Sequence, residues 1–184
     1  MPRLSIAGKL YTIFALLAAA TFALAGVAIF NCLRQAALTS EIEVASQGTL
    51  NVERVNGLIY AVVMESRGVY MSIDPKVVQV YADGIRQFNK RLAGIMDEWK
   101  RLERTIGSSH FHEFAGRVDQ FIKFREELAR RGTEINAAAG REWGDNDANR
   151  TVRKALNKDI EQLGKFYDDE LKQLYSDLEQ DVRR

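Results

Sequence analysis

The sequence predicts an all-α protein, with one N-terminal transmembrane helix followed by an antiparallel up-down-up-down four-helix bundle. Three observations support this fold class. The chain has 184 residues but only two prolines, and none follows Pro75, which favours long helices over the turn-rich pattern of an all-β domain. Apolar residues recur every three to four positions over most of the chain. One long uncharged stretch lies near the N-terminus.

This uncharged stretch covers residues 10–33, between Lys9 and Arg34. About 20 apolar residues are enough for a helix to cross the hydrocarbon core of a bilayer. Basic residues without any acidic residue precede the stretch, which predicts that residues 1–9 remain in the cytoplasm. We therefore expect a transmembrane helix over 10–33 and an exported domain over 34–184.

A cleaved signal peptide is the alternative for the same region. Ala23-Leu24-Ala25 resembles the small-residue site that signal peptidases recognise. The apolar run continues past this site as far as Leu33, which favours the uncleaved anchor. Both interpretations place the remainder of the chain outside the cytoplasm.

Four helices are expected in the exported domain, at 34–72, 75–106, 109–140 and 145–184. Their predicted buried positions are Val55, Leu58, Val62, Val69 and Ile73 in the first; Val77, Tyr81, Ile85, Phe88, Leu92, Ile95, Trp99, Leu102 and Ile106 in the second; Phe111, Phe114, Val118, Phe121, Arg125, Leu128, Gly132 and Ile135 in the third; and Val152, Leu156, Leu163, Tyr167, Leu174 and Leu178 in the fourth. The first helix also has a second, partly apolar face with Ile42, Ile59 and Val63, which predicts a homodimer.

The expected connections between these helices contain residues that cap helices and form turns. Asp74 followed by Pro75 is typical of an N-cap and the first helical position. The sequence 107–109, Gly-Ser-Ser, would end the second helix and cap the third. Residues 140–144 would form a loop, and Asp145 would cap the fourth helix. Connections this short force consecutive helices to run antiparallel.

Composition excludes several classes of function. The 26 basic and 25 acidic residues nearly cancel, so we expect no nucleic-acid binding. The single cysteine, Cys32, rules out an intrachain disulfide, a cysteine-based zinc site and a haem attachment motif. No glycine-rich phosphate loop, nucleophile elbow or H-E-x-x-H sequence is present. We therefore expect no enzyme activity, cofactor or metal.

Polar residues concentrate where the end of the first helix and the start of the fourth should lie at the same height. Extending the apolar seam backwards from Leu156 places Asn149 on the buried line, one turn before Arg153. Because guanidinium groups bind carboxylates bidentately, this region predicts a site for a small anionic ligand such as a carboxylate. The candidate ligand-binding residues are Arg67, Tyr70, Asn146, Asn149, Arg150, Thr151 and Arg153.

These candidate residues could instead have structural roles and bind no ligand. The arginines could pair with Glu65, Asp145 or Asp147, and Asn149 could form a local hydrogen bond.

Arg125 is a separate anomaly, because it is a charged residue on the predicted apolar seam. We expect it to extend its guanidinium to solvent or to pair with an acidic residue of another helix.

Two runs of sequence carry a resemblance to a known family. Residues 52–68, VERVNGLIYAVVMESRG, and 144–151, GDNDANRT, are similar to the end of the first and the start of the fourth sensor helix of bacterial methyl-accepting chemotaxis proteins. The resemblance implies a receptor input domain in the periplasm, anchored in the bacterial inner membrane. It also implies a homodimer, a small-molecule ligand bound far from the membrane, and signalling through the fourth helix.

The resemblance covers essentially the whole chain, which corresponds to the N-terminal part of such a receptor. We therefore expect either a fragment or a truncated gene product, without the second span and the signalling module. Related bundles also serve as sensor domains of histidine kinases, which remains an alternative. A membrane-anchored or secreted bundle that binds another protein is a further alternative.

Overall fold

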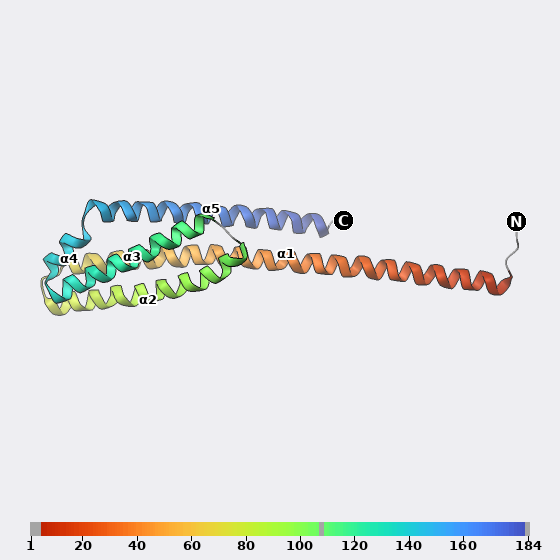
Figure 1. Cartoon of the computed structure of the whole chain (residues 1–184), viewed down its shortest axis with the longest axis horizontal. Helices are drawn as coiled ribbons and strands as arrows, with labels where there is room; N and C mark the ends of the chain where they lie inside the picture. Colours follow the sequence, from red (N-terminus) through yellow and green to blue (C-terminus); the bar gives the residue numbers. More distant parts are fainter. Residues whose placement is uncertain (1–4, 107–108, 183–184) are drawn as a thin grey trace. The chain divides into compact units, whose positions relative to one another are not determined.

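The computed structural model describes residues 5–106 and 109–182, and apart from short links between helices this part of the chain is helical. It contains α1 (Ile6–Met71), α2 (Pro75–Ile106), α3 (Ser109–Glu134), α4 (Ala137–Gly144) and α5 (Asp147–Val182), as Figure 1 shows. No strand occurs in the described residues. The all-α class predicted from the sequence is therefore confirmed, as is a long apolar helix at the N-terminus.

The chain divides into two compact units, one made of Met1–Glu43 with Leu174–Arg184 and the other of Val44–Gln173. In the first unit, α1 contains an 18-residue window with a mean hydropathy of 2.5, none of which is buried. The hydroxyls of Thr12 and Thr21 donate to the carbonyls of Gly8 and Leu17, so these polar groups are satisfied within the helix. By length and composition this part of α1 can cross a membrane.

The second unit, Val44–Gln173, contains a hydrophobic core to which α1, α2, α3 and α5 all contribute. Its centre is aromatic: the fully buried Trp99 lies with its ring centroid 5.1 Å from that of Phe111, 5.6 Å from Phe114 and 6.1 Å from Tyr167. The Trp99 indole N–H donates to the Tyr167 hydroxyl at 3.1 Å. This bond satisfies a donor that would otherwise be buried without a partner.

Most of the predicted core positions are buried or partly buried, but three are wrong. Ile73, Val77 and Ile135 are 94%, 41% and 59% exposed. In α2 the neighbouring Val78 is buried instead, and Ile106 lies outside the residues whose side chains are described. Val77 lies in the first turn of α2, and Ile73 and Ile135 lie just beyond helix ends.

Side-chain caps at the starts of α2 and α5 test two predicted helix boundaries. Asp74 accepts a hydrogen bond from the Lys76 backbone N–H at 2.9 Å, which confirms the predicted cap of α2. For α5 the predicted cap, Asp145, is wrong, because Asn146 accepts from the Asn149 backbone N–H at 2.9 Å and the helix begins at Asp147. The expected turn at 107–109 lies mostly outside the described residues.

The expected helix over 109–140 is also wrong, because α3 ends at Glu134 and a separate helix, α4, follows. Asn136 is extended, with φ −175° and ψ 169°, and its side chain accepts from the Ala139 backbone N–H at 2.8 Å. A Cβ added at Gly140 would lie 3.1 Å from the Cα of Gly132, so α4 approaches the backbone of α3 closely at this point. Residues 140–144, expected as a loop, therefore form part of a helix.

Candidate ligand-binding cavity

A cavity of about 360 Å³ lies in the second unit, among residues of α1, α3, α4 and α5 and the link before α5. Five of the seven candidate residues from the sequence line it together: Arg67, Tyr70, Asn149, Arg150 and Arg153. The remaining lining residues are Val63, Ser66, Arg125, Gly144 and Asp145. Four arginines and a single aspartate give the lining a net positive charge, which favours an anionic occupant.

Arg125 is the residue of this cavity whose role the sequence did not predict. It is 3% exposed, and its Nη1 donates to the Tyr70 hydroxyl at 3.2 Å. Its Cζ lies 5.1 Å from the ring centroid of Phe121 and 5.7 Å from that of Phe124, within the range of cation–π contacts. The expectation that Arg125 reaches solvent or pairs with an acidic residue is wrong, because among the described residues its charge meets a phenol and aromatic rings instead.

The Arg125 guanidinium is incompletely satisfied. Its Nε is buried and has no hydrogen-bond partner among the described residues. Burial, and the nearby charge of Arg153, lower the pKa of Arg125, whereas Tyr70 opposes this change. Burial disfavours the charged form of Tyr70 and so raises the pKa of its hydroxyl, which remains protonated and able to donate. Since arginine stays charged in proteins, the cavity wall contains a positive charge that has no counter-ion in the part of the chain that the structure describes.

The other three arginines differ in their partners. Arg150 pairs with Asp145 at 2.6 Å and Asp147 at 2.9 Å, as the alternative from the sequence allowed. In the part of the chain that the structure describes, neither Arg67 nor Arg153 forms an ion pair. The sequence alternative therefore holds for Arg150 and does not apply to Arg67 and Arg153.

The amide side chains stabilise the link between α4 and α5 rather than leaving all their groups available to a ligand. Asn149 is buried and lines the cavity, but its Nδ2 donates to the Gly144 carbonyl. Asn146 donates from Nδ2 to the Trp143 carbonyl at 2.8 Å and does not line the cavity. Thr151 is exposed, does not line the cavity, and donates to the Asp147 carbonyl at 2.9 Å.

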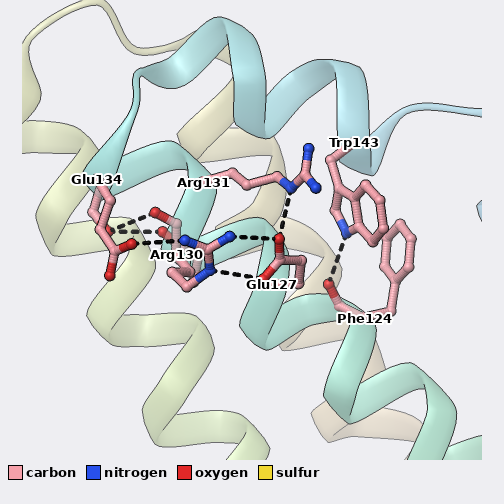
Figure 2. A network of polar contacts seen from close by, with 8 residues as sticks. Phe124, Glu127, Arg130, Arg131, Glu134 and Trp143 are labelled. Carbon is pink, nitrogen blue, oxygen red and sulfur yellow. Dashed lines mark hydrogen bonds and ion pairs between the residues drawn. The ribbon is translucent and has the colours of Figure 1, made fainter.

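A network of polar and aromatic contacts attaches α4 to α3, as Figure 2 shows. The Trp143 ring stacks on Phe124, with centroids 5.3 Å apart and planes at 15°, and its indole N–H points to the Phe124 carbonyl. Arg131 lies over Trp143, with its Cζ 4.2 Å from the ring centroid, and donates to Glu127 at 2.7 Å. Hydrogen bonds from Arg130 and Arg131 lower the pKa of Glu127 to about 2, so it remains ionised.

This network contributes to the shape of the cavity, because α4 ends at Gly144, one of the lining residues. Tyr70 is held from two sides: its hydroxyl accepts from Arg125, and its backbone carbonyl accepts from Arg141 of α4. A side chain at Gly144 would overlap the Tyr70 hydroxyl, so only glycine leaves that hydroxyl in place.

Compared with known proteins, the chain matches no family model, no curated protein and no solved structure. The residues of the cavity and the sequence resemblance are therefore the two indications of function.

Proposed function

We propose that the chain is the input domain of a bacterial chemoreceptor and binds a small anionic ligand in this cavity. The observation that carries the proposal is Arg125, a buried guanidinium with an unpaired Nε in a cavity lined by three further arginines. A buried charge without a counter-ion is destabilising, and an anionic ligand would supply that counter-ion. A bundle with a purely structural role would gain stability from an apolar residue at position 125.

In this proposal α1, α2, α3 and α5 form an antiparallel up-down-up-down four-helix bundle. All four contribute to one core, and the connection between Met71 and Pro75 is too short for parallel neighbours. The N-terminal part of α1 anchors the chain in the inner membrane, and the bundle lies in the periplasm. In a full-length receptor, ligand binding would shift α5, which contributes Asn149, Arg150 and Arg153 to the cavity.

Ligand-dependent stability is the direct test of this function. The full chain, purified in detergent, should unfold at a higher temperature with small carboxylates than with their neutral amide analogues. Inorganic anions that fit the cavity should likewise raise the unfolding temperature above its value in sodium chloride. A ligand at 100 times its Kd should add about 2.7 kcal/mol to the free energy of unfolding. The measurement is circular dichroism at constant ionic strength, with sodium chloride as the reference salt. A panel in which no anion differs from chloride would contradict the proposal.

We also propose a homodimer that forms along α1. The sequence argument for this partner is partly wrong, since Ile59 and Val63 are buried in the chain's own core. A different set of apolar residues on α1 is exposed: Leu50, Tyr60, Met64 and Met71. Leu50, Met64 and Met71 are separated by multiples of seven residues, the spacing that places side chains along one seam between two helices.

Crosslinking in cells tests both the dimer and the location of the bundle. In a Cys32→Ser background, Met64→Cys should be crosslinked to a dimer by a bifunctional thiol reagent that cannot cross the inner membrane. Asp97→Cys, exposed on α2, is the control and should react with a monofunctional reagent of the same kind without giving a dimer. Failure of both cysteines to react would contradict the periplasmic location. Reaction at Met64→Cys without crosslinking would contradict the dimer and favour a protein-binding role for this face.

A further inference from the structure

We infer that the cavity is specific for a dicarboxylate without an amino group, and that Arg125 binds its inner carboxylate. This inference rests on the proposed function, because it names the class of anion that the same cavity would bind. It depends on three observations: the unused edge of the Arg125 guanidinium, the two arginines that lack ion pairs, and the commitment of the single acidic residue.

The Arg125 guanidinium has one edge in use and one edge unused. Nη1 donates to the Tyr70 hydroxyl at 3.2 Å, and no other hydrogen bond is formed by this side chain among the described residues. Nε and the adjacent Nη2 form the parallel pair of donors that matches the two oxygens of a carboxylate. Nε is covered by surrounding atoms, so a carboxylate that engages this edge has to displace the side chains around it. The Tyr70 hydroxyl accepts from Arg125, and its own proton remains available for the same carboxylate.

Arg67 and Arg153 add positive charge at more exposed positions of the cavity lining. Arg67 is exposed and Arg153 is half-buried, and in the described residues neither forms an ion pair. Arg125, by contrast, is 3% exposed, so the positive charges extend from the buried wall to the rim. A ligand with two separated carboxylates can therefore satisfy Arg125 at one end and the rim arginines at the other.

The cavity offers little to an ammonium group. Asp145 is the only acidic residue in the lining, and Arg150 already binds it at 2.6 Å. An amino acid would place its positive charge among four arginines with no uncommitted carboxylate to compensate it. The dicarboxylate is therefore favoured over an amino dicarboxylate of the same length, although both contain the same pair of carboxylates.

The test measures binding of the straight-chain dicarboxylates from malonate to adipate to the full chain in detergent, by isothermal titration calorimetry. We expect at least one of them to bind at least tenfold more tightly than the monocarboxylate of equal chain length. Adding a 2-amino group to that diacid should weaken binding at least tenfold. Equal affinity for the diacid and the monoacid, or tighter binding of the amino diacid, would overturn the inference.

The same titration with variants assigns the inner carboxylate to Arg125. Arg125→Met should weaken the best diacid at least tenfold, and Arg125→Lys should not restore its binding, because lysine retains the charge but not the paired donors. Thermal unfolding without ligand establishes that each variant is folded. Arg117→Met is the matched control: it changes the same side chain on the same helix, but Arg117 pairs with Asp159 and does not line the cavity.

Two kinds of failure can be distinguished. If anions stabilise the protein but Arg125→Met binds the diacid as tightly as the unmodified chain, this inference is wrong and the proposed function stands. If no anion binds at all, the proposed function fails and this inference fails with it.

Discussion

Replacing Trp99 with alanine should lower the free energy of unfolding by about 3–5 kcal/mol, the range found for deletion of a buried aromatic side chain. Trp99 is fully buried and contacts Phe111, Phe114 and Tyr167, so removing it leaves a cavity bounded by three rings. The substitution also removes the indole N–H that donates to the Tyr167 hydroxyl. For a chain of this length the loss corresponds to a fall in Tm of about 6–20 °C.

Urea unfolding of the full chain in detergent, followed by far-ultraviolet circular dichroism, measures this effect without depending on tryptophan fluorescence. Trp143→Ala is the matched control, since it makes the same chemical change at a partly buried position of α4 and should cost less. Tyr167→Phe separates the hydrogen bond from the packing and should cost about 1–3 kcal/mol, because the Trp99 donor remains buried without that acceptor. Equal losses for the two tryptophan variants would contradict the central position of Trp99 in the core.

The sequence was sufficient to predict the helices where local chemistry determines their ends. Asp74 and Pro75 show this, because a capping side chain and a proline at the first turn are both local signals. The end of α3 could not be predicted in this way. It depends on the approach of Gly140 to Gly132, a contact that exists only once α4 has folded back on α3.

The predicted face of α2 was close to the buried face but rotated toward its largest apolar residues. Ile85, Leu92 and Trp99 are buried as predicted. The buried line is completed by Val78, Ala82, Asn89 and Met96. A hydropathy pattern gives little weight to Ala82 and excludes Asn89 from the predicted buried face of α2. Asn89 is buried because its side chain donates to the Ile122 carbonyl and to Glu126 of α3, a partner that α2 alone cannot indicate.

The candidate site was predicted because the end of the first helix and the start of the fourth should lie at the same level of an antiparallel bundle. The structure places five of its seven residues around one cavity. The sequence could not exclude Thr151 and Asn146. Thr151 lies on the exposed side of α5, where its hydroxyl donates to the Asp147 carbonyl, and Asn146 caps the start of α5. Arg125 stands out in the sequence as a charge on an apolar seam with no acidic partner at helical spacing. Its position in the cavity depends on the packing of α3 against α1 and α5, which the sequence does not indicate.

Replacing Arg67 or Arg153 with alanine should weaken binding of an anionic ligand about tenfold to a hundredfold. Each arginine would lose charge-assisted hydrogen bonds worth about 1.5–3 kcal/mol, and about 1.4 kcal/mol corresponds to a tenfold change in Kd. The fold should be retained, since Arg67 is exposed and neither residue forms an ion pair among the described residues. The measurement is titration of the full chain in detergent with the most stabilising anion.

The neighbours of the two arginines provide the controls. Arg54→Ala on α1 and Lys154→Ala on α5 remove exposed positive charges that do not line the cavity, and both should leave the Kd unchanged. Because the two rim arginines would act on the same anionic group, the double variant should lose less than the sum of the two single losses. Raising the salt concentration should weaken binding to the unmodified chain more than binding to the double variant, since exposed charges are screened. If both single variants bind the anion with the Kd of the unmodified chain, then the rim arginines do not contact the ligand and Arg125 alone would have to account for its binding.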